Sequence, residues 1–141
     1  QAHPDVRAVI SVNKGLVTQA SAAIPVVPLY FAILYKVMKR AGNHENCIQQ
    51  IARLFTQKLY TPEGFRTDEN GFIRMDDYEL LPEIQEEVKK CWKAVTTDTV
   101  NQYCDIDGYW EDFYHMFGFH YSDIDYTQDV DANVEINGIV M

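Results

Sequence analysis

The chain has 141 residues, of which 47% are hydrophobic and 13% aromatic. This is enough apolar material for one packed core and too much for a disordered tail. Its 21 acidic and 12 basic residues give a net charge of −9, and such a surface repels phosphate backbones, so we expect no nucleic-acid partner. A phosphorylated cofactor is still possible, because backbone N–H groups can hold a phosphate locally.

Two further features of composition bear on location. The chain has three cysteines, and their spacing matches no metal or redox motif. Because their number is also odd, we predict reduced thiols and a cytoplasmic location. They are Cys47, Cys91 and Cys104. The apolar stretch 22–35 contains two prolines and ends at Lys36, short of the roughly 20 apolar residues that a spanning helix needs. We therefore expect a buried helix and no membrane span.

The first predicted element is a strand over residues 6–12, VRAVISV. It is apolar and β-branched on both faces, which is typical of a buried parallel strand. Because no second strand of this kind follows, we expect the rest of its sheet to lie outside this chain. After a loop over 13–21, an apolar helix is expected over 22–40. Two prolines occupy its first turns, where they cost least, and Gly42-Asn43 ends it.

A second helix is expected over 44–59, with Asn43 as its N-cap. Apolar residues at three- and four-residue intervals predict its buried face. They are Ile48, Ile51, Leu54, Phe55 and Leu59. The run Asp68-Glu69-Asn70-Gly71 predicts a tight turn into a short strand over 72–75, and thus a small hairpin.

A third helix is expected over 82–95, beginning at Pro82, with an apolar stripe on one face and charges on the other. The stripe comprises Ile84, Val88, Cys91, Trp92 and Val95. Two shorter helices are expected near 99–104 and 108–117. An acidic, partly extended end follows from Tyr121 onward.

The junction of the first strand, the loop and the first helix is suited to a phosphate. The loop can turn its N–H groups outward, the Thr18 hydroxyl adds a donor, and the start of the helix adds a partial positive charge. In α/β sheets, ligands also bind at the carboxyl ends of the strands. An ordinary strand-to-helix turn has the same pattern and binds nothing, so the junction alone leaves both interpretations open.

One long segment carries a family resemblance. It begins at Pro4-Asp5-Val6-Arg7-Ala8 and continues through SVNKGLVTQASAAIPVVPLY over 11–30. The segment closely resembles the C-terminal portion of the NADH-dependent trans-2-enoyl-CoA reductase and FabV-type enoyl-ACP reductase family. Shorter matches extend the likeness over essentially the whole chain. They include Gly42-Asn43-His44-Glu45, Ile73-Arg74, Asp76-Asp77, Gly108-Tyr109 and Asp125-Tyr126.

The resemblance implies a Rossmann-like α/β fold, related to the short-chain dehydrogenases, for the full protein. It implies NADH as cofactor, an enoyl-CoA or enoyl-ACP substrate, and reduction of the C=C bond of a trans-2-enoyl thioester in fatty acid synthesis. Residues 1–21 would complete the dinucleotide-binding core, and residues 22–141 would form a helical region that covers the substrate. The chain itself would be one sheet strand plus a mainly helical part with the small hairpin.

The family's Gly-rich loop and its catalytic Tyr-x8-Lys precede the strand over 6–12. The resemblance therefore implies no catalytic residue in this chain, and it makes the missing N-terminal part of the same protein a required partner. Tyr30 and Lys39 repeat the x8 spacing, and Tyr35 and Lys39 have the x3 spacing of simpler dehydrogenases. Both pairs follow the cofactor loop, so we interpret them as chance spacing on a helix.

The resemblance also implies which residues meet the ligands. The backbone of Leu16 would meet the nicotinamide carboxamide, and the Thr18 hydroxyl would meet the pyrophosphate. The implied cofactor residues are Leu16, Val17, Thr18, Ala20 and Ser21. For Ser21, a simple N-cap is the alternative.

A second implied set lines the acyl pocket. Its members are Leu16, Val17, Val27, Phe31, Tyr35 and Tyr109. Val27, Phe31 and Tyr35 follow a four-residue step and so share one helix face. Ordinary core has the same periodicity, which leaves core packing as the alternative.

No metal site is expected. His115 and His120 straddle Gly118 and lack the i, i+4 register of a helical zinc site. His44 and Glu45 are interpreted as part of a helix cap.

Two functions from different classes remain. One is the C-terminal part of an NADH-dependent enoyl reductase, inactive by itself. The other is a non-catalytic helical interaction module derived from such a reductase. The residues that precede Gln1 discriminate between them, because a Gly-rich loop and a Tyr-x8-Lys there favour the enzyme.

Overall fold

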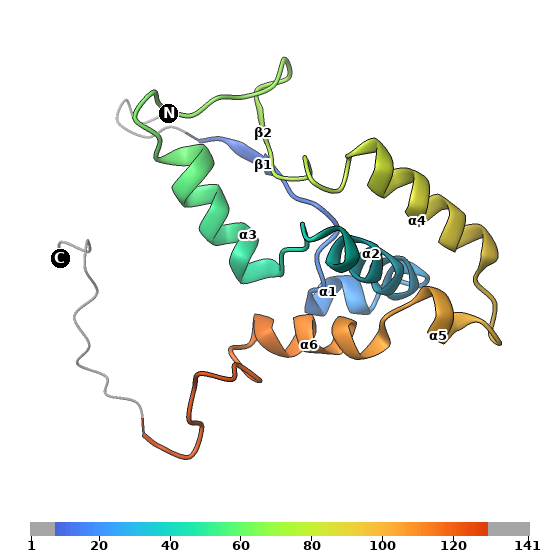
Figure 1. Cartoon of the computed structure of the whole chain (residues 1–141). Helices are drawn as coiled ribbons and strands as arrows, with labels where there is room; N and C mark the ends of the chain where they lie inside the picture. The colour runs from blue at the N-terminus through green and yellow to red at the C-terminus, as the bar shows by residue number, and fades with distance from the viewer. Residues whose placement is uncertain (1–7, 130–141) are drawn as a thin grey trace.

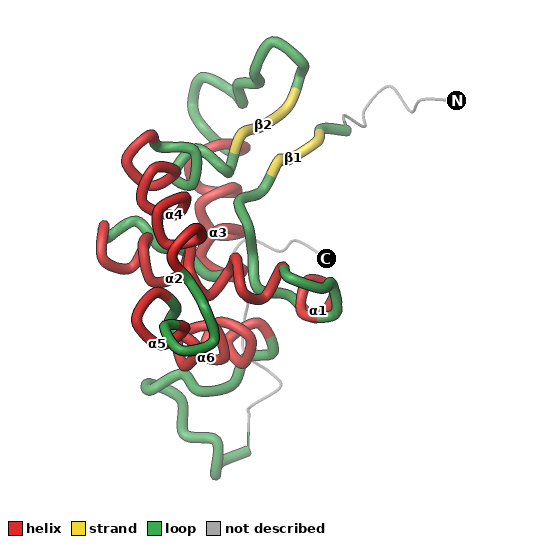
Figure 2. Tube along the Cα trace, turned by 90° about the vertical axis from the view of Figure 1, so that its right-hand side faces the viewer, coloured by secondary structure: helices red, strands yellow, loops and turns green. Residues whose placement is uncertain are grey.

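The computed structural model describes residues 8–129, in which two short strands lie beside a group of packed helices (Figure 1). The elements in chain order are β1 (Ile10–Val12), α1 (Gln19–Ala22), α2 (Val27–Ala41), α3 (Cys47–Arg53), the π-helix η1 (Leu54–Leu59), β2 (Phe72–Arg74), α4 (Pro82–Ala94), α5 (Val100–Tyr103) and α6 (Ile106–Met116). Helix α2 is central, because α1, α4 and α6 all pack against it. Figure 2 shows the strands at one end of the molecule and α5 and α6 toward the other.

The two strands are parallel neighbours, with Ile10 opposite Phe72 in the register. This corrects two predictions, because β1 has a partner within the chain and β2 does not form a hairpin. The turn Asp68–Gly71 does form, with the Gly71 N–H donating to the Asp68 carbonyl at 3.0 Å. The turn leads into β2, which pairs with β1, far earlier in the sequence. Residues 6 and 7 of the predicted first strand lie outside the described residues.

The helix predicted over 22–40 corresponds to α2, which begins only at Val27, and most of α1 lies in the predicted loop over 13–21. Residues 23–26 separate the two helices, and Val26 adopts a left-handed conformation with φ 72° immediately before α2. Pro28 lies in the first turn of α2, where a missing N–H is tolerated. Proline lacks an N–H and disfavours a helical conformation in the residue before it, which agrees with the interruption around Pro25. Gly42, in the left-handed conformation, ends α2 as predicted.

The core lies between α2, α4 and α6. Its buried members include Ala32, Ile33, Leu34, Val37, Met38, Ile84, Val88, Cys91, Cys104 and Tyr109. The bounds predicted for the third helix agree with α4, and three residues of its predicted stripe are buried, whereas Trp92 is 39% exposed. The two short predicted helices are α5 and α6, shifted by one or two residues.

The predicted second helix is wrong in its cap and its regularity. Asn46, not Asn43, is the N-cap, and its side chain accepts from the Gln49 N–H at 2.8 Å. After Arg53 the chain continues as the π-helix η1. A π-helix has a wider turn, so the 3.6-residue period assumed in the prediction does not hold there.

The buried face predicted for this helix is also wrong. Ile48, Ile51 and Phe55 are 47%, 46% and 45% exposed, whereas Gln50 and Arg53 are 1% and 6% exposed. Both buried side chains donate to the carbonyl of Met75, just beyond β2. The polar side of α3 therefore faces the interior, because polar groups that follow β2 bind its side chains.

Two predictions about location can be compared with the described part. No helix within residues 8–129 is long and apolar enough to cross a membrane. All three cysteines are free thiols, with Cys91 and Cys104 buried, as predicted.

Candidate functional site

The predicted cofactor loop follows the carboxyl end of β1 and leads into α1. Thr18 is the N-cap of α1, and its hydroxyl accepts from the Ser21 N–H at 3.1 Å. In return, the Ser21 hydroxyl accepts from the Thr18 N–H at 2.9 Å, which completes a capping box. Ser21 is thus the third residue of the short helix rather than its N-cap, which corrects the alternative considered for it.

The same bonds bear on the ligand contacts predicted for the loop. The Thr18 hydroxyl lies 3.1 Å from the Ser21 hydroxyl, which is itself 3.1 Å from the Leu16 carbonyl. A phosphate would have to draw the Thr18 proton away from Ser21. Val17 is 5% exposed and belongs to the core, while Ala20 is exposed on α1. The contacts of Leu16, Thr18 and Ser21 with a cofactor stay predictions.

The loop packs directly on α2 at Gly15. A Cβ atom at this position would lie 2.6 Å from the Phe31 ring and 3.2 Å from Leu34. Real Cβ atoms do not approach other atoms this closely, so glycine is required by the packing. This contact brings Phe31, a predicted acyl-pocket residue, against the predicted cofactor loop.

The other aromatic residues of the predicted pocket meet where α2 crosses α6. The Tyr35 ring lies against Gly108, where a Cβ would come within 2.0 Å of it. Tyr109, the next residue of α6, is buried in the core. Val27 is half-buried at the start of α2, two turns before Tyr35. The structure therefore gathers the predicted pocket along α2, between the loop and α6.

Sequence reasoning missed a buried pair behind this pocket. His44 Nε2 lies 2.9 Å from an Asp112 carboxylate oxygen, and the two side chains are 4% and 8% exposed. The His44 ring also stacks edge-on against Tyr35, with centroids 4.4 Å apart. His44 thus joins the start of α3 to α6, and the interpretation of His44 and Glu45 as a cap is wrong, because Glu45 binds Arg53 at 2.7 Å.

A second missed group is Lys14, which is 5% exposed and donates to the Gly15 carbonyl at 3.2 Å. Burial lowers the pKa of Lys14, although the nearby carboxylates of Asp112 and Glu79 oppose that shift. One sequence signal could have found it. Lys14 lies two residues after the apolar run 6–12, and a cation there in so acidic a chain indicates compensating carboxylates. The strand itself is less buried than predicted, because Ile10 is 59% exposed.

His44 gives the structure a pH dependence. Burial lowers the pKa of His44, outweighing the contact with Asp112 that raises it. As pH falls, the unfolded chain takes up the proton first, at the ordinary histidine pKa of about 6.5. Stability contributed by neutral His44 is therefore complete above about pH 6.5 and lost below it, by at most about 1.4 kcal/mol per pH unit. Urea unfolding from about pH 8 to 5 should show a shallower decline for His44→Gln than for the unaltered protein.

His120 supplies the matched control for this experiment. Its side chain is 48% exposed and lies near Glu111 at 3.2 Å. His120→Gln should leave the decline below about pH 6.5 unchanged. An equal pH dependence in His44→Gln and the unaltered protein would contradict the assignment.

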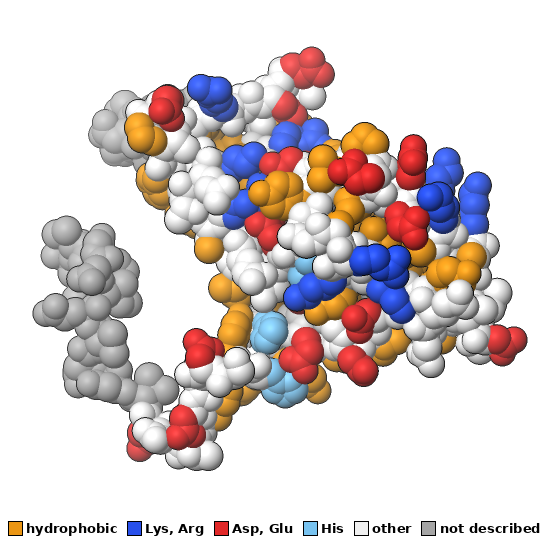
Figure 3. All heavy atoms as spheres, in the orientation of Figure 1, with side chains coloured by type: hydrophobic (Ala, Val, Ile, Leu, Met, Phe, Trp, Pro, Cys, Tyr) orange, Lys and Arg blue, Asp and Glu red, His pale blue; other side chains and the backbone are white. Residues whose placement is uncertain are grey.

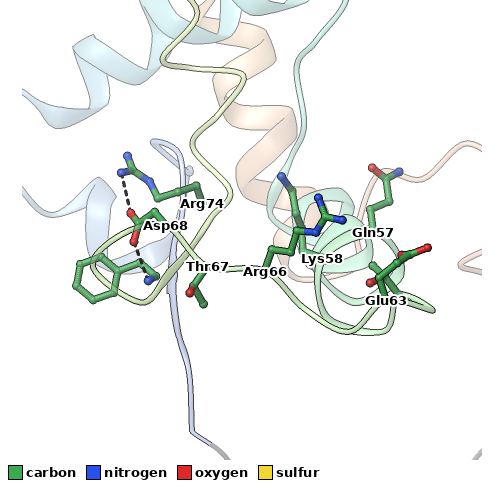
Figure 4. Close-up of a pocket in the computed structure, with 9 residues that line it drawn as sticks. Gln57, Lys58, Glu63, Arg66, Thr67, Asp68 and Arg74 are labelled. Carbon is green, nitrogen blue, oxygen red and sulfur yellow. Dashed lines mark hydrogen bonds and ion pairs between the residues drawn. The ribbon is translucent and has the colours of Figure 1, made fainter.

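A cavity of about 700 Å³ lies between η1 and β2 (Figure 4). It is lined by Gln57, Lys58, Thr61, Glu63, Arg66, Thr67, Asp68, Phe72 and Arg74. Phe72 and Arg74, the first and last residues of β2, both line it, but none of the residues predicted to meet the cofactor or the acyl group does. Two of its cations are paired, Lys58 with Asp77 at 2.8 Å and Arg74 with Asp76. This cavity is therefore not the candidate site.

Metal ligation is not supported in the described part of the chain. No group of three or more His, Cys, Asp or Glu side chains among residues 8–129 could hold an ion. His115 and His120 both approach Glu111, at 3.8 and 3.2 Å.

Two family models match the chain in succession. Residues 1–60 match the trans-2-enoyl-CoA reductase catalytic region, and residues 67–130 match the enoyl reductase FAD binding domain. Among curated proteins, an enoyl-[acyl-carrier-protein] reductase [NADH] of Cytophaga hutchinsonii is 51% identical over 134 residues, which is 95% of this chain and 34% of that protein. One from Coxiella burnetii is 50% identical over 135 residues, 96% of this chain and 33% of that protein.

Solved structures give the same result. The trans-2-enoyl-CoA reductase of Clostridium acetobutulicum in complex with NADH has a TM-score of 0.76 and 48% identity, over 89% of this chain and 31% of that one. The Treponema denticola enzyme in complex with NAD also has a TM-score of 0.76 and 48% identity, over 90% and 32%.

In sequence and in fold, the chain is similar to part of proteins named as NADH-dependent enoyl-acyl-carrier-protein reductases and trans-2-enoyl-CoA reductases. More narrowly, the predicted resemblance to the trans-2-enoyl-CoA reductase and FabV-type enoyl-ACP reductase family is confirmed. The chain spans about a third of the length of the curated relatives that it matches.

Proposed function

We propose that this chain is the C-terminal part of an NADH-dependent reductase of the C=C bond of trans-2-enoyl-CoA or enoyl-ACP. The observation that carries the proposal is the continuous match, at 51% identity over 134 residues, to a protein named for that activity. The position of the loop at the carboxyl end of β1 supports it, because α/β sheets bind their ligands at that edge. The free thiols agree with the cytoplasmic location that we propose for the protein.

In this proposal the full protein has a Rossmann-like core, of which residues 1–21 form the last part, and residues 22–141 cover the substrate. Bound NADH supplies the hydride for the β-carbon of the enoyl group. The loop of this chain orients it, through the backbone at Leu16 and the hydroxyl of Thr18. The proton donor is the Tyr-x8-Lys pair implied in the part that precedes this chain.

The aromatic residues on α2 and α6 form the wall of the proposed acyl pocket and exclude water. Burial raises the pKa of Tyr35 to about 12 and also raises that of Tyr109. Both phenols therefore stay protonated at neutral pH, so they can donate hydrogen bonds but cannot serve as bases. The paired Tyr-Lys spacings on α2 are likewise not catalytic in this proposal, because Tyr30 donates to Glu79 while Lys39 lies 5.3 Å from the centre of the Tyr35 ring.

The second family model is named for FAD binding. Within residues 67–129, the inward-facing side chains pack in the core against α2. They include Ile84, Val88, Cys91 and Tyr109. The proposed chemistry uses NADH, because the similar enoyl-acyl-carrier-protein reductases are named for NADH and the similar solved structures hold NAD or NADH.

The exposed apolar side chains fit a chain that packs against more protein. Figure 3 shows hydrophobic side chains along the edge that runs from α3 toward α6. In α3, η1 and α6 and at the end of α6, six large apolar side chains are each 40–49% exposed: Ile48, Ile51, Phe55, Trp110, Tyr114 and Phe117. We propose that the missing part of the same protein covers this edge, since two thirds of each relative lies outside the matched region.

The test is reductase activity of the full-length protein that contains this chain. It should consume NADH in step with crotonyl-CoA or a crotonyl carrier protein, and mass spectrometry should show a product heavier by two hydrogens. Residues 1–141 alone should show no turnover. A full-length protein that binds neither NADH nor either thioester would favour the non-catalytic interaction module instead.

A further inference from the structure

One carboxylate holds the cofactor loop from a distant part of the chain. Glu79 lies between β2 and α4, and its Oε2 accepts the Gly15 N–H at 2.5 Å. Its Oε1 accepts the Tyr30 hydroxyl at 2.6 Å. A single side chain therefore binds both the loop and the helix α2 that follows it.

The other atoms around Gly15 leave the peptide little freedom. Its carbonyl accepts from Lys14 Nζ at 3.2 Å, and the Phe31 ring occupies the space where a side chain would lie. Both polar groups of Gly15 are thus bound to charged side chains. Leu16, whose backbone is the proposed nicotinamide contact, is the next residue.

The Glu79 carboxylate offers a separate oxygen to each donor. The Gly15 N–H has no lone pair and must donate, and burial together with the Glu79 contact raises the pKa of Tyr30, so this phenol keeps its proton. Charge-assisted bonds of this kind are short and roughly twice as strong as neutral ones. The Lys14 ammonium supplies a compensating positive charge near Glu79.

We propose that Glu79 is a positioning residue for hydride transfer: it holds Gly15, and through it the Leu16 backbone, at a fixed place relative to α2 and the acyl pocket. The proposal rests on the proposed reductase function and goes beyond it, because Glu79 itself touches neither ligand. Its link to Tyr30 couples the cofactor loop to the helix that carries Phe31.

The test compares Glu79→Ala with Glu86→Ala in the full-length protein. Glu86 is exposed on α4 and serves as the matched control, since it loses the same group without touching the loop. Removing Glu79 leaves two donors without their acceptor, so we expect KM for NADH to rise about tenfold. KM for the enoyl thioester should stay within about twofold, and Glu86→Ala should match the unaltered protein in both.

Conservative variants separate positioning from bulk stability. In Glu79→Gln the amide oxygen can accept from Gly15 while the amide N–H donates to the Tyr30 oxygen, so KM for NADH should stay within about threefold. Glu79→Asp keeps the charge but cannot reach both donors, and should raise it about fivefold. Tyr30→Phe removes one of the two bonds and should have a smaller effect than Glu79→Asp.

The outcomes distinguish this proposal from the proposed function. If the unaltered full-length protein reduces no enoyl thioester, the proposed function fails first. If it is active, and Glu79→Ala lowers the melting temperature while KM for NADH stays within twofold, Glu79 is structural only and the proposal is overturned. Should Glu79→Ala not fold, Glu79→Asp decides in the same way, because an unchanged KM for NADH in that variant also overturns it.

Discussion

Replacing Arg53 by alanine is expected to lower the free energy of unfolding by about 3–5 kcal/mol. The Arg53 side chain is 6% exposed, and its Nε donates to Glu45 at 2.7 Å. Its Nη2 donates to Asp77 at 2.9 Å and to the Met75 carbonyl at 3.1 Å. Truncation leaves the Glu45 carboxylate, only 13% exposed, without its partner, and such an uncompensated charge is costly.

Urea unfolding checks this prediction, and Arg40 provides the control. Arg40 is 66% exposed and lies 3.9 Å from Glu87, so Arg40→Ala should cost less than about 1 kcal/mol. Arg53→Lys should fall between the two, because an ammonium cannot reproduce the forked contact. Equal losses for Arg53→Ala and Arg40→Ala would show that the buried network contributes little to stability.

Arg53 also shows why the face of α3 could not be predicted. Along residues 44–59 the apolar periodicity indicates which side should be buried, and the structure buries the other side at Gln50 and Arg53. The reason lies in the segment after β2, whose carbonyl and carboxylate groups bind them. A local pattern carries no information about polar partners that arrive from a distant strand.

The elements that could be predicted are those whose signals are local. The strong amphipathic pattern of α4 gave its bounds, and Gly42 marked the end of α2. The loop after β1 is also present, although its last three predicted residues belong to α1, which Thr18 caps. The parallel pairing of β1 with β2 was missed because a three-residue strand has too few side chains to show a period.

In the candidate site, too, some residues could be predicted from the sequence and others could not. Its aromatic members were implied by resemblance, and the structure gathers them along α2. The carboxylates behind them were missed, because Glu79 and Asp112 each look like ordinary surface residues in sequence. Only the fold shows that Glu79 reaches Gly15, 64 residues earlier.

Replacing Gly108 by alanine is the second change with a large expected effect. The new Cβ would lie 2.0 Å from one Tyr35 ring carbon and 2.4 Å from another. The ring has little room to retreat, because the His44 ring lies 4.4 Å away and Lys39 covers it at 5.3 Å. We expect overpacking to cost about 1–3 kcal/mol, more than the roughly 1 kcal/mol that alanine gains over glycine in a helix.

A second mutation shows whether Tyr35 is the cause. In a Tyr35→Ala background the space is open, so Gly108→Ala should be neutral or stabilising by up to about 1 kcal/mol. In the full-length protein, Gly108→Ala should raise KM for the enoyl thioester at least about fivefold and KM for NADH much less, because Tyr35 belongs to the proposed acyl wall and not to the loop. The same loss of stability in both backgrounds would mean that α6 is strained elsewhere. A loss of stability seen only when Tyr35 is present would show that the Tyr35 ring causes the overpacking. The proposed pocket wall and the α2–α6 packing would then depend on the same contact, in which Gly108 sets how closely the ring approaches α6.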